Sequence, residues 1–311
     1  MKYLITGGTV FVSKFVATYF VHKGHKVFAL NRGTKAQVDG INLIKADRAE
    51  LNGSLNEMSF DAVIDICAYN EADIKNIIEA NVKFKDYIFI SSSAVYPETL
   101  PQPFNEKQRV GRNKIWGDYG TNKIEAENYL LSTCPTAYII RPPYLYGPMQ
   151  NLYREPFVFE CAELCRRFYI PYNGEMKLQF FHVEDLCRLI ELIIKNHPDS
   201  HVLNVGSEPV SINTFVELCY KVVGKPLEKV FVENHPNQRD FFSFYNYEYI
   251  LDISLLNEIL PMQKDLYCGL KESYEWYKNN KSSVIKKPYI DFIDMNFESF
   301  CGANTSLKWK K

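Results

Sequence analysis

Tyr119 and Lys123, which lie four residues apart in the segment YGTNK, have the side chains needed for proton transfer. Residues i and i+4 share one face of a helix. A lysine ammonium near a phenol favours the phenolate, so the tyrosine can act as acid or base near neutral pH. A run of serines at 91–93 follows a short apolar segment, where a hydroxyl could bond to the reacting oxygen. A Tyr-x-x-x-Lys spacing alone occurs by chance in many helices, so the surrounding elements must decide its meaning.

A turn near the N-terminus, Thr6 to Ser13 (TGGTVFVS), is placed to hold the pyrophosphate of a dinucleotide. It lies between a short apolar strand and an amphipathic helix, where such turns bind phosphates through backbone amides. Gly7 fills the first of the three small positions of the dinucleotide fingerprint, but Val10 and Ser13 fill the second and third. The β-branched Val10 should crowd the pyrophosphate, so two readings stay open: a loop that binds loosely, or a cofactor fold whose loop has decayed. The residues expected to contact the cofactor here are Gly7, Gly8, Val10, Phe11 and Val12.

The second expected strand ends at Asn31 and Arg32, where many dinucleotide-binding folds carry an acidic residue for the ribose hydroxyls. Asn31 lacks the charge that repels a 2′-phosphate, and Arg32 can pair with one. NADP is therefore favoured over NAD, with a solvated loop arginine as the alternative reading of Arg32. Asp47, after the third expected strand, is placed to meet the adenine edge, and Lys123 is expected to bond to the nicotinamide ribose.

Short apolar runs alternate with amphipathic ones through the first half of the chain. This alternation predicts an α/β fold with a Rossmann-like, doubly wound parallel sheet. This alternation becomes less regular after Gly147-Pro148, so we expect a smaller mixed α/β part that binds substrate. The expected division is residues 1–148 with about 181–206 for the dinucleotide-binding part, and 149–180 with about 207–311 for the substrate-binding part. The sequence predicts strands over 3–5, 25–30, 42–45, 61–66, 87–90, 137–141 and 201–205, and helices over 15–23, 72–82, 119–131, 156–168, 185–195 and 211–223.

Composition narrows the class of protein further. The 311 residues include 36 Lys+Arg and 37 Asp+Glu, a net charge of −1, so a polyanionic partner is not signalled. No apolar run approaches the roughly 18 residues of a membrane helix, and the N-terminus leads directly into a strand, so we expect a cytoplasmic protein. The eight cysteines form no C-x-x-C pair, and none has a histidine at zinc-finger spacing. We expect buried thiols, Cys161 and Cys165 included, and no metal site.

These features together resemble the extended short-chain dehydrogenases/reductases, the NAD(P)-dependent epimerase/dehydratase family. The resemblance covers nearly the whole chain and is most like the branch that contains the chloroplast stem-loop-binding proteins and their bacterial relatives. It implies roles for Tyr119 as acid/base, Lys123 as its tuner and Ser92 as hydrogen-bond partner of the reacting oxygen. The motifs that carry it are TGGTVFVS at Thr6, KADR around Asp47, DAVIDICA at Asp61, SSSAVY at Ser91, YGTNK at Tyr119, RPPYLYGP at Arg141, FFHVEDL at Phe180, LNVGSE at Leu203 and the RD pair at Arg239.

Two departures bear on the substrate that the resemblance implies. The diphosphate-binding Asn of those epimerases is replaced by Tyr144, and their substrate-phosphate arginine by Leu178, although Arg239 could still meet a phosphate. The first hypothesis is an NAD(P)-dependent epimerase, dehydratase or reductase acting on a nucleotide-sugar or similar hydroxylated molecule, with Tyr144 and Arg239 at the substrate and a homodimer possible. The alternative is an RNA-binding protein on the same scaffold, for which lysines 278, 281, 286 and 287 would supply a basic patch.

Overall fold

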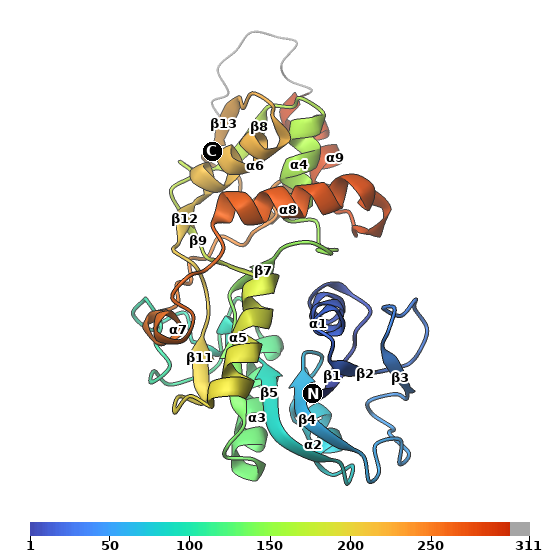
Figure 1. Ribbon diagram of the computed structural model, residues 1–311. Coiled ribbons are helices and arrows are strands. Elements are labelled where there is room, and N and C mark those ends of the chain that lie inside the picture. Colours follow the sequence, from blue (N-terminus) through green and yellow to red (C-terminus); the bar gives the residue numbers. More distant parts are fainter. Residues whose placement is uncertain (299–311) are drawn as a thin grey trace.

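The computed structural model describes residues 1–298, which form a seven-stranded parallel sheet and a second, mixed part above it (Figure 1). The strand order is β3-β2-β1-β4-β5-β6-β11, so the order reverses between β1 and β4. This is the doubly wound, Rossmann-like arrangement that the sequence predicts. The strands of this sheet are β1 (Lys2–Thr6), β2 (Lys26–Asn31), β3 (Asn42–Lys45), β4 (Ser59–Asp65), β5 (Lys83–Ile90), β6 (Tyr138–Arg141) and β11 (Val202–Asn204).

The central strands are apolar because helices cover both faces of the sheet. Ile5 of β1 pairs with Ala29 of β2 and with Ile64 of β4, and all three side chains are fully buried. Parallel sheets of this kind need near-continuous apolar runs rather than alternating ones. The register also places the carboxyl ends of β1, β2, β4 and β5 at one edge, where Figure 1 shows the second part.

Two pairs of helices enclose the sheet. On one face, α1 (Phe11–His22) packs beside α5 (Val183–Asn196); on the other, α2 (Glu71–Ile78) packs beside α3 (Asp118–Thr133). The sequence predicts α5 well, because most of its apolar residues recur on one helical face and are buried. A left-handed residue, His197, ends that helix.

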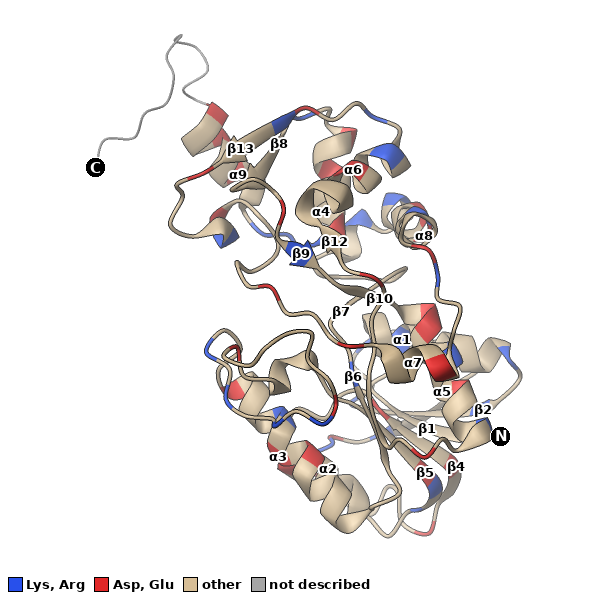
Figure 2. Ribbon diagram, turned by 90° about the vertical axis from the view of Figure 1, so that its left-hand side faces the viewer, with Lys and Arg blue, Asp and Glu red and all other residues tan. Residues whose placement is uncertain are grey.

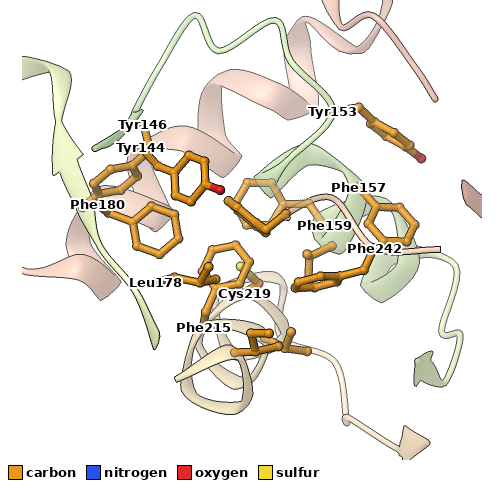
Figure 3. Packing of buried hydrophobic residues seen from close by; sticks show 14 of the residues in the cluster. Tyr144, Tyr146, Tyr153, Phe157, Phe159, Leu178, Phe180, Phe215, Cys219 and Phe242 are labelled. Atoms are coloured by element: carbon orange, nitrogen blue, oxygen red, sulfur yellow. The ribbon is translucent and has the colours of Figure 1, made fainter. Parts of the chain in front are cut away.

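The remaining elements build most of the second part, whose core is rich in aromatic rings (Figure 3). The expected boundaries between this part and the sheet part stay a prediction. One helix of the second half of the chain, α7, packs against strand β11 of the sheet. These elements are β7 (Tyr144–Tyr146), α4 (Glu155–Glu163), β8 (Phe168–Pro171), β9 (Lys177–Leu178), β10 (Phe180–His182), β12 (Val210–Ser211), α6 (Ile212–Val223), β13 (Lys229–Val232), α7 (Ser254–Ile259), α8 (Leu266–Asn279) and α9 (Tyr289–Ile293), with short helical turns η1 (Ser93–Val95), η2 (Gln238–Asp240), η3 (Lys281–Ser283) and η4 (Asp294–Glu298).

One predicted helix is shorter than expected. The segment 156–168 was expected to be helical throughout, but α4 ends at Glu163 and β8 begins at Phe168, paired with β13. Cys165 adopts a left-handed backbone (φ 54°) in the turn between them and is exposed, so its expected burial is wrong. Cys161, still inside the helix, is buried as expected. Within residues 1–298, no helix combines the length and the apolar character that crossing a membrane requires.

Candidate active site

The glycine turn between β1 and α1 has the backbone that only glycine adopts easily. Gly7 and Gly8 have φ values of +90° and +88°. A side chain at Gly7 would also collide with its surroundings, because a Cβ there would lie 2.6 Å from the Cys67 Sγ and 2.9 Å from the Ser13 Oγ. Both glycines therefore shape the turn, as the sequence predicts.

The N-terminus of α1 offers backbone amides to an anion. Its N-cap residue, Val10, makes no side-chain cap hydrogen bond, and the first turn carries no acidic residue. By contrast, Asn70, Ser211 and Asp265 cap the amides of α2, α6 and α8. Uncapped first-turn amides at the positive end of a helix fit a pyrophosphate. The residues present therefore suit the dinucleotide that the turn predicts.

Val10 itself causes no backbone strain. Its φ of −138° is extended, and the Ser13 hydroxyl donates to its carbonyl at 3.0 Å. The positive φ falls instead on the next residue, Phe11 (φ 31°), which is buried. A non-glycine residue in this region costs on the order of 1–3 kcal/mol. The unusual sequence of the loop is thus accommodated by strain at Phe11.

Asn31, at the end of β2, forms hydrogen bonds that hold the same loop in place. The Asn31 side-chain amide donates to the Gly7 carbonyl at 2.7 Å and accepts from the Gly33 amide at 2.8 Å. The Gln37 side chain also accepts a hydrogen bond from the Asn31 Nδ2 and donates one to the Asn31 Oδ1. Asn31 is therefore fully engaged within the protein, and its expected contact with a ribose stays a prediction. Arg32 is exposed beside it.

Asp47 and its neighbour Arg48 have different positions. Asp47 is exposed at the carboxyl end of β3 and accepts a hydrogen bond from Ala49 at 2.9 Å. Arg48 turns inward and forms an ion pair with Asp65, which is fully buried. Thr6 and Tyr87 also donate to that carboxylate, at 2.7 and 2.6 Å. Burial raises the pKa of Asp65, but the Arg48 guanidinium outweighs it and keeps the pKa below its ordinary value.

The Asp65 cluster was missed by reasoning from the sequence. Its signal was present, because an aspartate inside the apolar run DAVIDI needs a buried partner. The cluster joins β1, β4 and the segment after β3 directly below the glycine turn. It therefore fixes the edge of the sheet at which the cofactor would bind.

The structure brings Ser92, Tyr119 and Lys123 together at this edge, as predicted. The Lys123 Nζ lies 6.0 Å from the centre of the Tyr119 ring and is buried, donating to the carbonyls of Ala68 and Ile90 at 2.7 and 3.0 Å. The Ser92 hydroxyl lies within hydrogen-bonding reach of the Tyr119 phenol. The three side chains come from the end of β5 and the first turns of α3.

Ser91 and Ser92 differ in the partners of their hydroxyl groups. The Ser91 hydroxyl donates to Glu127 at 2.5 Å, and Glu127 forms a buried ion pair with Arg141. Ser91 is thereby held in the core. Ser92 is half-buried, and its hydroxyl accepts a bond from the Ala94 amide at 3.2 Å and faces the Tyr119 phenol instead of the core.

The electrostatics of the pair differ from the expected pattern. Burial lowers the pKa of Lys123 to about 8. Partial removal of its hydroxyl from water also raises the pKa of Tyr119, although the residue as a whole is 40% exposed, and the hydrogen bond from Ser92 only partly offsets this rise. Within residues 1–298, Lys123 therefore does not lower the pKa of the Tyr119 phenol as expected. Its ammonium bonds to two backbone carbonyls instead of to the phenol. A positively charged group beside Tyr119 is needed to bring its pKa toward neutrality.

The two expected substrate residues lie in the second part. Tyr144 is buried at 8% exposure within the aromatic core, beside Phe180 (Figure 3). Arg239 is half-buried, donates to the Ser243 carbonyl and lies over the Tyr245 ring at 4.6 Å. Tyr245 contacts Trp116, whose carbonyl accepts from the Tyr119 amide at 3.2 Å. Arg239 is therefore linked to the start of α3 through Tyr245 and Trp116.

The lysines expected to form a basic patch are mostly paired with acids. Lys278, Lys281 and Lys286 each contact a glutamate at 2.5–2.8 Å. Figure 2 shows basic and acidic residues interspersed over both parts. The local charge available to an RNA backbone is correspondingly reduced.

One cluster has the residue types of a metal site. His182, Glu184 and Glu272 place their ligand atoms within 4.8 Å of one another. The Lys264 ammonium bonds to both glutamates, and the His182 Nδ1 accepts from the Glu184 amide. That bond leaves the proton of neutral His182 on Nε2, the nitrogen that would have to bind a metal. The positive charge that balances the two glutamates of this cluster is thus the Lys264 ammonium.

Comparison with known proteins identifies the family. The model of the NAD dependent epimerase/dehydratase family matches residues 3–206. The chain belongs to this family. It is 29% identical over 303 residues to the chloroplast stem-loop binding protein of 41 kDa b of Arabidopsis thaliana, covering 88% of this chain and 78% of that protein. It is 26% identical over 266 residues to a probable GDP-L-fucose synthase 1 of Oryza sativa subsp. japonica, covering 76% of each.

Solved structures of the family share the fold. The UDP-glucose 4-epimerase of Thermotoga maritima, determined with UDP-glucose, superposes with a TM-score of 0.72 at 20% identity, covering 90% of this chain and all of that one. The sheet, the glycine turn and the helix that carries Tyr119 and Lys123 thus belong to a fold that this epimerase shares.

Proposed function

We propose that this chain is an NAD(P)-dependent enzyme that epimerises, dehydrates or reduces a nucleotide-sugar or a similar hydroxylated small molecule. The observation that carries the proposal is the convergence of Ser92, Tyr119 and Lys123 beside the glycine turn. An intact Tyr–Lys pair at this edge has its chemical use next to a nicotinamide. We further propose that residues 1–148 and about 181–206 hold the cofactor.

The cofactor would be held by groups already in place. The first-turn amides of α1 suit the pyrophosphate, and Asp47 and Arg32 lie exposed at the ends of the next strands. When bound, the nicotinamide supplies hydride transfer at a carbon of the substrate. Its positive charge in the oxidised form would also lower the pKa of Tyr119, which burial alone raises. NADP is favoured over NAD because Arg32 can pair with a 2′-phosphate.

Proton transfer is the task of Tyr119. In the oxidative direction its phenolate oxygen accepts the proton of a substrate hydroxyl while the carbon that bears this hydroxyl loses its hydride. The Ser92 hydroxyl donates a hydrogen bond to the same substrate oxygen and stabilises its developing charge. Lys123, whose pKa burial lowers to about 8, is the residue that would bond to the nicotinamide ribose beside Tyr119. In the reverse direction Tyr119 returns the proton.

The net reaction distinguishes the members of this class. An epimerase or dehydratase returns the hydride and leaves the cofactor unchanged, whereas a reductase releases oxidised cofactor. The test begins with mass spectrometry of any nucleotide released when the purified chain is denatured. Incubation with UDP-, GDP- and dTDP-sugars follows, with NMR of the products. NAD(P) in the released fraction together with an epimerised, dehydrated or reduced sugar supports the proposal. Absence of both outcomes overturns it.

A further inference from the structure

One strand of the second part, β13, has an unpaired edge. It forms a two-stranded parallel sheet with β8, and within residues 1–298 it pairs with no other strand. Figure 1 shows this pair at the end of the second part that is farthest from the parallel sheet. The pairing runs without interruption from Lys229, opposite Phe168, to Val232, opposite Pro171. β13 therefore has neither a bulge nor a proline, which commonly protect an edge strand from pairing with another chain.

The backbone groups of β13 point alternately toward β8 and away from it. The Phe168 amide donates to the Glu228 carbonyl at 2.8 Å, and the Tyr172 amide donates to the Val232 carbonyl at 2.9 Å. Because neighbouring residues of a strand direct their backbone groups to opposite sides, Phe231 points its N–H and C=O outward. The outward groups of this edge are those of residues 229, 231 and 233. In the described part of the chain, no hydrogen bond joins them to another segment.

The side chain at the centre of this edge is apolar and exposed. Phe231 is 49% exposed, and together with Tyr172 it lines an open hollow of about 490 Å³. Lys229 and Glu233 share a face of the strand with Phe231, because side chains two residues apart point the same way. The Lys229 ammonium bonds to Glu217 of α6, and Glu233 is exposed. The edge thus presents a phenylalanine with a cation on one side and an anion on the other.

The sequence of this edge, Lys-Val-Phe-Val-Glu over residues 229–233, is complementary to itself when two copies run antiparallel. With Phe231 opposite Phe231 of a second copy, each Lys229 lies opposite a Glu233. The two phenylalanines then form a hydrogen-bonded pair that exchanges both N–H···O bonds, because their backbone groups point outward. Opposite charges and aromatic pairs directly across such a ladder stabilise it. Registers centred on Val230 or Val232 would leave Lys229 and Glu233 without opposite charges across the ladder.

We infer that β13 is an interface between two copies of this chain. The two edges join antiparallel about a twofold axis and form a four-stranded sheet in the order β8-β13-β13-β8. Such an interface uses the same surface of both copies, as closed dimers do. Each Phe231 ring would lie against its counterpart and reduce the exposed apolar surface beside Tyr172. This contact lies in the second part and does not depend on the proposed function.

Sedimentation velocity of the full chain over a dilution series tests the interface. Wild type should associate. Glu233→Lys, which places a lysine opposite each Lys229, should weaken association about tenfold or more and halve the mass of the assembly. Lys229→Glu should do the same, and an equimolar mixture of these two variants should associate again, because every lysine of a mixed pair faces a glutamate. Glu228→Lys is the matched control, because its exposed side chain would face the neutral Asn234, and it should associate like wild type.

Phe231→Pro removes the outward N–H of the central pair and keeps the bonds to β8, so it should also weaken association. It replaces Lys229→Glu if loss of the bond to Glu217 unfolds that variant. Hydrogen exchange should show the wild-type Phe231 amide protected in the assembly. A monomeric wild type, or an assembly whose mass neither Glu233→Lys nor Phe231→Pro changes, would overturn the inference. Protection of this amide that Glu233→Lys leaves intact would also overturn it, because a segment of the same chain would then cover the edge.

Discussion

At the scale of single residues, burial shifts the pKa values of Lys123 and Tyr119 in opposite directions. Burial disfavours the charged form of each group, so it lowers the pKa of Lys123 to about 8 and raises that of Tyr119. The phenol is therefore neutral in the protein alone at pH 7. In the proposed function, its action as a base requires a further positive charge, such as oxidised nicotinamide would carry.

Replacement of Tyr119 by Phe tests this assignment. The ring packs in the same way without its hydroxyl, so only proton transfer is lost, and turnover should fall 10²-fold or more with cofactor affinity nearly unchanged. Tyr129→Phe, on the same helix, is the control and should keep full activity. Steady-state rates on the identified sugar nucleotide provide the measurement. Wild-type turnover by Tyr119→Phe would refute the Ser–Tyr–Lys assignment.

We propose that Arg32 favours NADP over NAD by pairing with the 2′-phosphate. Arg32→Ala should weaken NADP binding by about 1–3 kcal/mol through loss of a charge-assisted pair, and leave NAD affinity almost unchanged. Calorimetric titration with both nucleotides checks the prediction. Lys195→Ala, an exposed lysine on α5, serves as the control. Equal losses for the two nucleotides would mean that Arg32 does not read the 2′-phosphate.

At the scale of elements, the turn between β1 and α1 is the most unusual feature of the chain. Val10 stays extended, while Phe11 takes the positive φ. Val10→Gly should tighten NADP binding by removing the side chain nearest the expected pyrophosphate. It should also destabilise the free protein by roughly 0.5–1 kcal/mol through added chain entropy.

Thermal shifts of wild type and Val10→Gly, with and without NADP⁺, measure both effects. A larger NADP⁺-induced shift in the variant is the predicted result. A larger shift in wild type would show that Val10 does not crowd the nucleotide.

The start of α4 gives a prediction about pH. Glu155 is 1% exposed, and within residues 1–298 neither carboxylate oxygen has a well-formed hydrogen bond. Burial raises its pKa, more than the neighbouring Arg154 lowers it. The folded state then binds a proton more tightly than the unfolded state. Stability from this group is present below the unfolded pKa and is lost as pH rises through the higher folded pKa.

Glu155→Gln removes this titration. The variant should be more stable than wild type near pH 8, with the difference shrinking as the pH falls toward 4.5. Urea denaturation across this range, with Glu125→Gln on the exposed face of α3 as control, measures the difference. A difference that does not change with pH would show that Glu155 is not the group responsible.

The elements themselves were largely predictable from the sequence. The apolar runs at β1, β3 and β4 and the amphipathic pattern of α5 predict the doubly wound sheet, because burial on one or both faces dictates those periods. The turn at Cys165 was not predictable, because the pairing of β8 with β13 interrupts a helical pattern through contacts distant in sequence. For the same reason the Arg48–Asp65 pair emerged only from the three-dimensional structure.

At the scale of the whole molecule, the site is assembled from segments that are far apart in the chain. β1, β2, β4 and β5 end at one edge of the sheet, and the second part lies above that edge (Figure 1). Lys264 joins the two parts, because its amide donates to Asp185 on α5 and its ammonium bonds to Glu272 on α8.

The most direct test of the account is whether the purified chain binds a nicotinamide dinucleotide. Calorimetric titration with NAD⁺ and NADP⁺ should show binding of at least one, with NADP⁺ tighter. A stem-loop RNA titrated in parallel should bind only weakly at physiological salt. Tight RNA binding with no heat from either dinucleotide would contradict the account.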